Sequence, residues 1–222
     1  MSGPMSSQGT KILLSDSTTE LAITAASKAA PCVLTVTGTV TAVVNDWVFV
    51  ADTGFASLDN RWWKLSAVAA QALTLAGSDT TGETTAGNRG TVTQASGLIE
   101  ICLASLSRDS PAAATLDVTT LCDTSRQQRS GMKNNGTWTA QGFYDPGSAG
   151  QQQLRQAYDL GDDRMLKIVP PDLSEIIFMT QVNQLSESFA VDQPVQVTAG
   201  GVVMGAPQYV LPPGATPLME AA

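Results

Sequence analysis

The sequence contains no histidine among its 222 residues. This absence excludes Ser-His-Asp and Cys-His nucleophilic catalysis, histidine-ligated metal sites and imidazole pH switches. Charged residues make up only 14% of the chain and aromatic residues only 5%. No apolar run approaches the roughly 18 residues typical of a membrane-spanning helix. The missing residue types therefore exclude most enzyme classes and predict a protein with no membrane span and no bound cofactor.

Cysteine is also scarce, because Cys32, Cys102 and Cys122 are far apart and form no CxxC motif. A disulfide framework or a structural zinc site needs more cysteines at closer spacing. We therefore expect three small, buried thiols in a reducing compartment. The amino terminus lacks the basic and apolar segments of a signal peptide, so we expect a soluble protein made in the cytoplasm and not exported by its own signal.

The charge of the chain is acidic, with 12 basic and 20 acidic residues and a formal net charge of −8. Acidity without a basic stripe argues against a protein that grips nucleic acid by its phosphates. Apolar residues make up 43% of the chain, which is enough to bury a core.

Short alternating segments separated by turn residues predict an all-β chain, folded as a sandwich or barrel. Residues 122–135 form a polar loop between two of these segments. The strand candidates are residues 11–14, 33–40, 46–52, 61–68, 72–75, 90–93, 98–107, 117–121, 137–144, 165–169, 176–182 and 195–199.

One segment, residues 149–160, has the pattern of a helix. Ser148 and Gln151 have the spacing of a capping box, and Gly161 is a typical terminator. Leu154, Ala157 and Tyr158 would form its buried face, at helical spacing.

Three other groups of residues have both a chemical and a structural interpretation. Asp159, Asp162 and Asp163 could supply metal ligands, but they lack the alternate-ligand order of a calcium loop, so a solvated turn is favoured. Asp172 and Glu175 could act as acid and base, yet nothing in the sequence places a pocket around them. Trp47, Trp62 and Trp63 could stack on a sugar, although their alternating strands favour packing in the core.

An ordered set of short segments runs from residue 98 to about 210. The segments are 99–101 (IEI), 106–107 (LS), 116–121 (LDVTTL), 136–142 (GTWTAQG), 144–147 (YDPG), 150–154 (GQQQL), 167–168 (KI), 195–199 (VQVTA) and 205–207 (GAP). In order and spacing this set resembles the major tail tube proteins of bacteriophages with long, non-contractile tails. Residues 28–93 look like an additional unit found in many such proteins, with matching turns at 52–54, 59–61 and 78–81.

The resemblance implies an all-β fold with one α-helix, in which two packed antiparallel sheets are flanked by the helix. It implies an N-terminal arm and first strand (1–27), an inserted small β unit (28–96), a tail-tube core (97–210) and an irregular tail (211–222). Such a subunit would be a structural protein and not an enzyme.

The same resemblance implies a function and partners. Six copies would form a ring, and stacked rings would form a hollow tube around a tape-measure protein. The tube would later conduct double-stranded DNA without binding it specifically, and tip or initiator and terminator proteins would cap its ends. We expect assembly in the host bacterial cytoplasm and a place in the virion. A capsid decoration or head–tail joining protein, and a carbohydrate-binding module of a phage fibre, remain alternatives.

Two sets of charged residues are candidates for roles in such a tube. Arg126, Arg129 and Lys133 in the polar loop would dock on the adjacent ring, with a merely solvated loop as the alternative. Residues after Ser96 carry −6 of the net charge. Acidic side chains on the inner wall would repel DNA evenly, whereas an ordinary outer surface is the alternative. The candidates for the wall are Glu100, Glu187 and Asp192.

Overall fold

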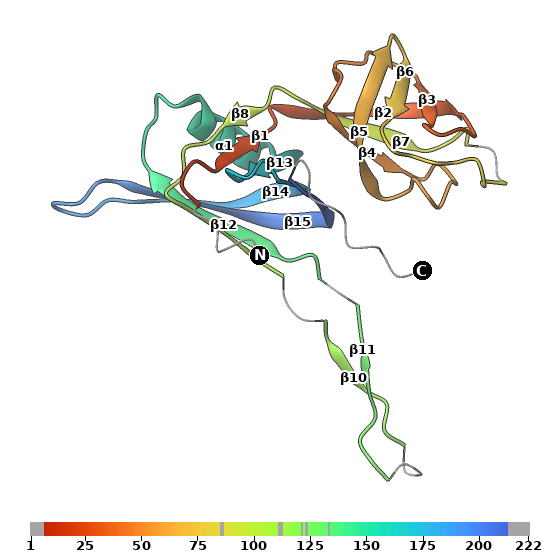
Figure 1. Ribbon diagram of the computed structural model, residues 1–222. Coiled ribbons are helices and arrows are strands. Elements are labelled where there is room, and N and C mark those ends of the chain that lie inside the picture. Colours follow the sequence, from red (N-terminus) through yellow and green to blue (C-terminus); the bar gives the residue numbers. More distant parts are fainter. Residues whose placement is uncertain are drawn as a thin grey trace.

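The computed structural model describes residues 7–84, 87–110, 113–120, 122, 124–132 and 134–212. These residues form a closed six-stranded barrel, a seven-stranded antiparallel sheet with one helix, and a projecting two-stranded hairpin (Figure 1). The all-β fold with one α-helix and antiparallel sheets is therefore confirmed. The part of the chain that the structure describes contains no helix long and apolar enough to cross a membrane.

The barrel is closed in the order β2-β3-β6-β5-β4-β7. Alternate side chains fill its interior, among them Leu21, Leu34 and Val50. It begins at Ser17, before the boundary expected at residue 28, because Leu21 and Ile23 of β2 point into this core. Its strands are β2 (Ser17–Ala26), β3 (Val33–Val36), β4 (Trp47–Ala51), β5 (Arg61–Ala69), β6 (Ala72–Leu75) and β7 (Thr91–Ser96).

The sheet has the order β8-β1-β13-β14-β15-β12-β9 and consists of two halves that share its two longest strands. β13 pairs with residues 176–181 of β14, whereas β12 pairs with residues 196–202 of β15. The strands are β8 (Ile99–Glu100), β1 (Lys11–Leu14), β13 (Asp163–Val169), β14 (Glu175–Ser188), β15 (Gln196–Val210), β12 (Thr137–Phe143) and β9 (Ser105–Asp109).

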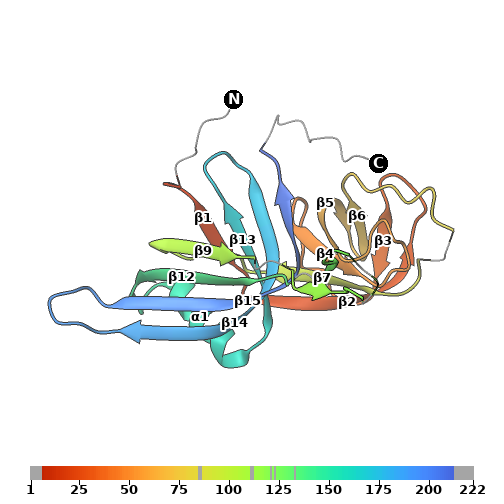
Figure 2. The ribbon, with the colours of Figure 1, turned by 90° about the horizontal axis from the view of Figure 1, so that it is seen from below.

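The sheet bends where its two halves meet (Figure 2). Register shifts interrupt the pairing of β14 with β15 between Ile177 and Met179 and between Val182 and Gln184. Such bulges bend a strand and let one sheet enclose a core. The two expected sheets are thus two halves of one sheet. We call β9, β12, residues 182–188 of β14 and residues 196–202 of β15 the four-stranded half.

Helix α1 (Ala149–Leu160) covers the core between the two halves. Leu154 and Ala157 are buried there, but Tyr158 is 43% exposed, so its expected place on the buried face is wrong. The buried stripe is shifted toward Gln153, whose Nε2 donates to the carbonyls of Ser15 (3.3 Å) and Asp16 (3.1 Å).

The two ends of α1 differ in how well the sequence predicts them. Gly161 ends the helix in the left-handed conformation (φ 63°), and its N–H donates to Ala157 O at 3.0 Å. The expected capping box is wrong, because the Ser148 side chain makes no capping bond. Gln151 instead accepts from Asp145 N at 2.9 Å and donates to Phe143 O, which ties the helix to the end of β12.

An apolar cluster joins the barrel to the sheet. Trp47, Trp62 and Phe49 of the barrel pack against Met165 and Ile177 of the sheet. Trp47 and Trp62 are only 8% and 5% exposed, so they have no open ring face on which a sugar could stack. The expected packing role of these tryptophans is therefore favoured by the structure.

The expected polar loop at residues 122–135 is part of a hairpin. β10 (Thr115–Asp117) pairs with β11 (Gln128–Ser130), and this hairpin projects away from the sheet (Figure 1). We call residues 110–136, between β9 and β12, the arm. Of the expected irregular tail, only residues 211 and 212 are among those described.

Candidate assembly surfaces

The four-stranded half has two open edges. β9 pairs with β12 on one side, and within the described chain no strand lies on its other side. Residues 182–188 of β14 pair only with β15 among the described strands, because β13 begins opposite Gln181. Unpaired strand edges are templates for pairing with another chain, so both edges are candidate contact surfaces.

One face of the four-stranded half is uncovered and mostly uncharged. On β12, the exposed Thr137, Thr139 and Gln141 alternate with residues buried under α1. The pairing register aligns Gln141 with Thr198 on one side and Ser105 on the other. We call this surface the open face, and its members are Ser105, Ser107, Asp109, Thr137, Thr139, Gln141, Phe143, Gln184, Ser186, Ser188, Gln196, Thr198, Gly200 and Val202.

The structure does not bring the three expected wall acids together. Glu187 lies opposite Val197, on the face covered by α1, where it forms an ion pair with Arg155. Asp192 lies in the turn between β14 and β15, with a φ of 61°. Glu100 lies on β8, which is separated from β14 by two strands. Asp109 is the acid that the register places on the open face instead.

The arm has one apolar face and one polar face. Leu116 lies directly opposite Arg129, so these side chains share a face, with Val118 two residues further along it. Leu116 is 56% and Val118 is 42% exposed. Asp117, on the other face, lies 3.3 Å from Arg126, and hydrogen bonds from Thr119 lower the pKa of Asp117. Lys133 lies outside the described residues.

The aspartates considered above as metal ligands or as catalytic groups make contacts with other residues of the fold. Asp162 pairs with the buried Arg164 at 2.8 Å. Burial, and then the charges of Asp162 and Glu20, raise the pKa of Asp163. Among the residues that the structure describes, no group of three acids or cysteines could hold a metal ion. Asp172 accepts from Ser174, which lowers the pKa of Asp172.

The cysteines differ from one another in burial. Cys32 is buried in the barrel core, whereas Cys102 and Cys122 are exposed. The expectation of three buried thiols is therefore wrong, because Cys102 follows the edge strand β8 and Cys122 lies in the arm.

Comparison with known proteins identifies the family of this chain. A family model described as "Phage tail tube protein" matches residues 53–211. The chain therefore belongs to the phage tail tube protein family, which is structural and non-enzymatic.

Two of the solved structures to which the chain is similar come from gene transfer agent particles. One is a chain of the virion of a native particle, with 15% identity and a TM-score of 0.45, covering 51% of this chain and 89% of that one. Another is from the tail of an empty particle with C6 symmetry, with 15% identity and a TM-score of 0.42, covering 49% and 82%. No curated protein sequence matches the chain.

Proposed function

We propose that six copies of this subunit join edge to edge into a ring. β9 of one copy would lie beside residues 182–188 of β14 in the next. Both edges belong to the same four-stranded half, so repeated pairing with a rotation between copies closes a barrel to which each copy contributes four strands. The number six comes from the resemblance to tail tube proteins, and closure would remove both open edges.

The open face would line the channel of this ring. α1 covers the opposite face of the four-stranded half, and hydroxyl and amide side chains dominate the uncovered one. A wall with no Lys or Arg offers double-stranded DNA no phosphate contact that would hold it. In this arrangement Asp109 faces the channel, Asp192 lies at one end of it, and Glu187 faces away. Glu100 lies outside the four-stranded half.

Stacking of these rings would make the tube. Head-to-tail stacking joins unlike surfaces and continues as an open filament. The arm would dock on the adjacent ring through the face that carries Leu116, Val118 and Arg129. The barrel, residues 17–96, would stand apart from the channel as a separate unit, because it packs on the other half of the sheet.

The tube would hold a tape-measure protein and then conduct genomic DNA into the host. Tip or initiator and terminator proteins would cap its ends, and assembly would take place in the host bacterial cytoplasm before the tail becomes part of the virion. Membership in the tail tube family supports this sequence of events.

The observation that carries the proposal is the pair of open edges on one four-stranded half. Negative-stain electron microscopy of the purified chain tests it. We expect rings or tubes of one diameter. Images that show only monomers or trimers would indicate a capsid decoration protein and would overturn the proposal. Retention of the chain on a polysaccharide column would indicate a fibre module and would overturn it as well.

A further inference from the structure

The arm and the turn between β14 and β15 lie at opposite ends of the four-stranded half. The register pairs Asp109 with Thr137, so the arm leaves one end of the strands. Phe143 pairs with Gln196, which pairs with Ser188, so the turn closes the other end. Figures 1 and 2 show the β14–β15 hairpin extending beyond its neighbours, and Figure 1 shows that it extends away from the arm. When rings stack head to tail, the arm end of one copy meets the turn end of another.

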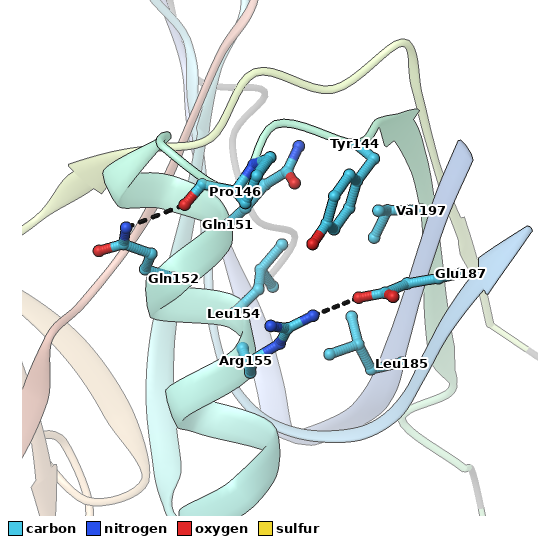
Figure 3. A pocket seen from close by; sticks show the side chains of 9 residues that line it. All are labelled: Tyr144, Pro146, Gln151, Gln152, Leu154, Arg155, Leu185, Glu187 and Val197. Carbon is cyan, nitrogen blue, oxygen red and sulfur yellow. Dashed lines mark hydrogen bonds and ion pairs between the residues drawn. The ribbon is translucent and has the colours of Figure 1, made fainter. Parts of the chain in front are cut away.

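A pocket lies beside the turn end, between α1 and the β14–β15 hairpin (Figure 3). Its apolar walls come from Tyr144, Leu154, Leu185 and Val197, and the Arg155–Glu187 ion pair lies at one side. Its volume is about 50 Å³. One water needs only roughly 10–15 Å³, so the pocket can admit the end of an aliphatic side chain.

The rim of this pocket is also apolar. Phe189 packs edge-on against Tyr144, with ring centres 6.4 Å apart, yet it is 69% exposed. Val191, in the same turn, is 90% exposed. Apolar side chains gathered at a projecting turn are typical of a surface that another protein covers.

The charge of the arm is opposite to that of the turn end. Residues 111–135 contain three basic and two acidic residues, which leaves the rest of the chain with a formal charge of −9. The turn end carries three acids, Asp145, Glu187 and Asp192, and among the residues that the structure describes there the one cation is Arg155. A partner with an apolar face and a positive charge would therefore be complementary to this surface.

We propose that this pocket and its rim receive the arm of a second copy of this chain in the adjacent ring. Leu116 and Val118 of the arm would cover the pocket and the side chains of Phe189 and Val191. Arg129, on the same face of the arm, would lie near Glu187 and Asp192. This assignment rests on the proposed ring stacking and names the surface on which stacking depends.

Disulfide cross-linking in assembled tubes tests the contact. The background carries Cys102→Ser and Cys122→Ser, which remove the exposed native thiols. Leu116→Cys is combined with Val191→Cys, and oxidised samples are run on non-reducing gels. A disulfide needs Cα atoms within about 7 Å. We expect covalent multimers from tubes and single chains from unassembled protein.

A matched control replaces Val191→Cys with Ser66→Cys, an exposed position on β5 of the barrel. A third pair, Leu116→Cys with Glu20→Cys, reports a different acceptor, the cleft between barrel and sheet lined by Phe49, Met179 and Met204. Cross-linking through Ser66→Cys or Glu20→Cys, with none through Val191→Cys, would overturn the proposed acceptor.

Two further variants separate this inference from the proposed function. Val191→Asp should leave rings intact but prevent their stacking, because it puts a charge in the apolar contact; tubes of normal length would overturn the acceptor. Replacing residues 113–132 with a short loop should also give unstacked rings. If the armless chain forms tubes, the stacking role of the arm fails. If the armless chain gives only rings while Val191→Asp forms normal tubes, the arm is needed for stacking but the proposed acceptor surface is wrong.

Discussion

Trp47 Nε1 in the barrel donates a hydrogen bond of 2.7 Å to Glu175 Oε2 in the seven-stranded sheet. The other carboxylate oxygen of Glu175 lies 2.9 Å from Lys167 Nζ. These polar contacts border the apolar cluster of Trp62, Met165 and Ile177. The barrel is therefore fixed to the sheet by side-chain contacts in addition to the connecting chain.

The first prediction concerns this junction. Trp47→Phe removes the donor and should lower the free energy of unfolding by about 1–3 kcal/mol, because Glu175 loses a partner in a half-buried place. Glu175→Gln keeps an oxygen that can accept from Trp47 but gives up the ion pair with Lys167, so its loss of stability reports that pair. Denaturant unfolding of the unassembled subunit measures both. Equal stability of Trp47→Phe and the parent chain would show that the bond contributes nothing.

The second prediction concerns the helix. Leu154→Ala should lower the free energy of unfolding by about 2–5 kcal/mol, since Leu154 is 2% exposed in the core. Tyr158→Ala, on the same helix, should lower it by less than Leu154→Ala does, because Tyr158 is 43% exposed and leaves no fully enclosed cavity. A larger loss for Tyr158→Ala than for Leu154→Ala would contradict the observed orientation of α1.

The third prediction concerns two aspartates whose pKa values are shifted in opposite directions. Burial and nearby acids raise the pKa of Asp163, so its ionised form destabilises the fold at neutral pH. Asp163→Asn should therefore raise the melting temperature at pH 7, and this gain should disappear as the pH falls below the ordinary value of 3.8.

Asp172 provides the matched comparison. Hydrogen bonds from Ser174 lower the pKa of Asp172, so its ionised form contributes stability above pH 3.8 that is lost as the pH falls through the lowered pKa. Asp172→Asn should therefore lower the melting temperature at pH 7. Melting curves between pH 2 and 7 measure both variants, and shifts of the same sign at pH 7 would refute this assignment.

The fourth prediction concerns the arm. Its strands are short, and its exposed face offers little to bury within one subunit, so its amides should exchange rapidly in the unassembled protein. They should become protected once rings stack. Hydrogen exchange with mass spectrometry compares the two states, with β12 as an internal reference. Equal protection of the arm in subunits and tubes would exclude a role in stacking.

The fifth prediction concerns the channel wall. Gln141→Lys with Thr198→Lys puts two cations on adjacent strands of the open face and should slow DNA delivery, most visibly at low salt. Gln156→Lys, at an exposed position on α1, serves as the comparison and should leave delivery from intact tubes unchanged. If the comparison variant slows delivery and the open-face variant does not, the channel lies on the other side of the sheet.

Local pattern predicted much of this fold. β1 and β6 have the expected bounds, and α1 has both expected ends, because alternation, helical spacing and a terminating glycine are local signals. β2 was missed, since its Ser, Thr and Ala residues leave only Leu21 and Ile23 as a sign of burial. The single strand expected at residues 98–107 is two strands, β8 and β9, which lie at opposite edges of the sheet.

The side chains that share a face of the candidate assembly surfaces are decided by the register of strand pairing, which the local sequence pattern does not show. Glu187 follows a bulge between Val182 and Gln184, and this one-residue shift decides which face its side chain joins. The pairing of Leu116 with Arg129, which makes the arm two-faced, also depends on a register that the sequence does not show. The cationic residues of the arm, by contrast, could be found from composition alone.

The most direct test of the edge-to-edge ring is a cryo-electron microscopy reconstruction of tubes assembled from the full chain. The account predicts one continuous β-barrel around the channel, with β9 of each copy hydrogen-bonded to residues 182–188 of its neighbour and the open face turned inward. A tube in which these two edges do not meet, or in which α1 lines the channel, would contradict it.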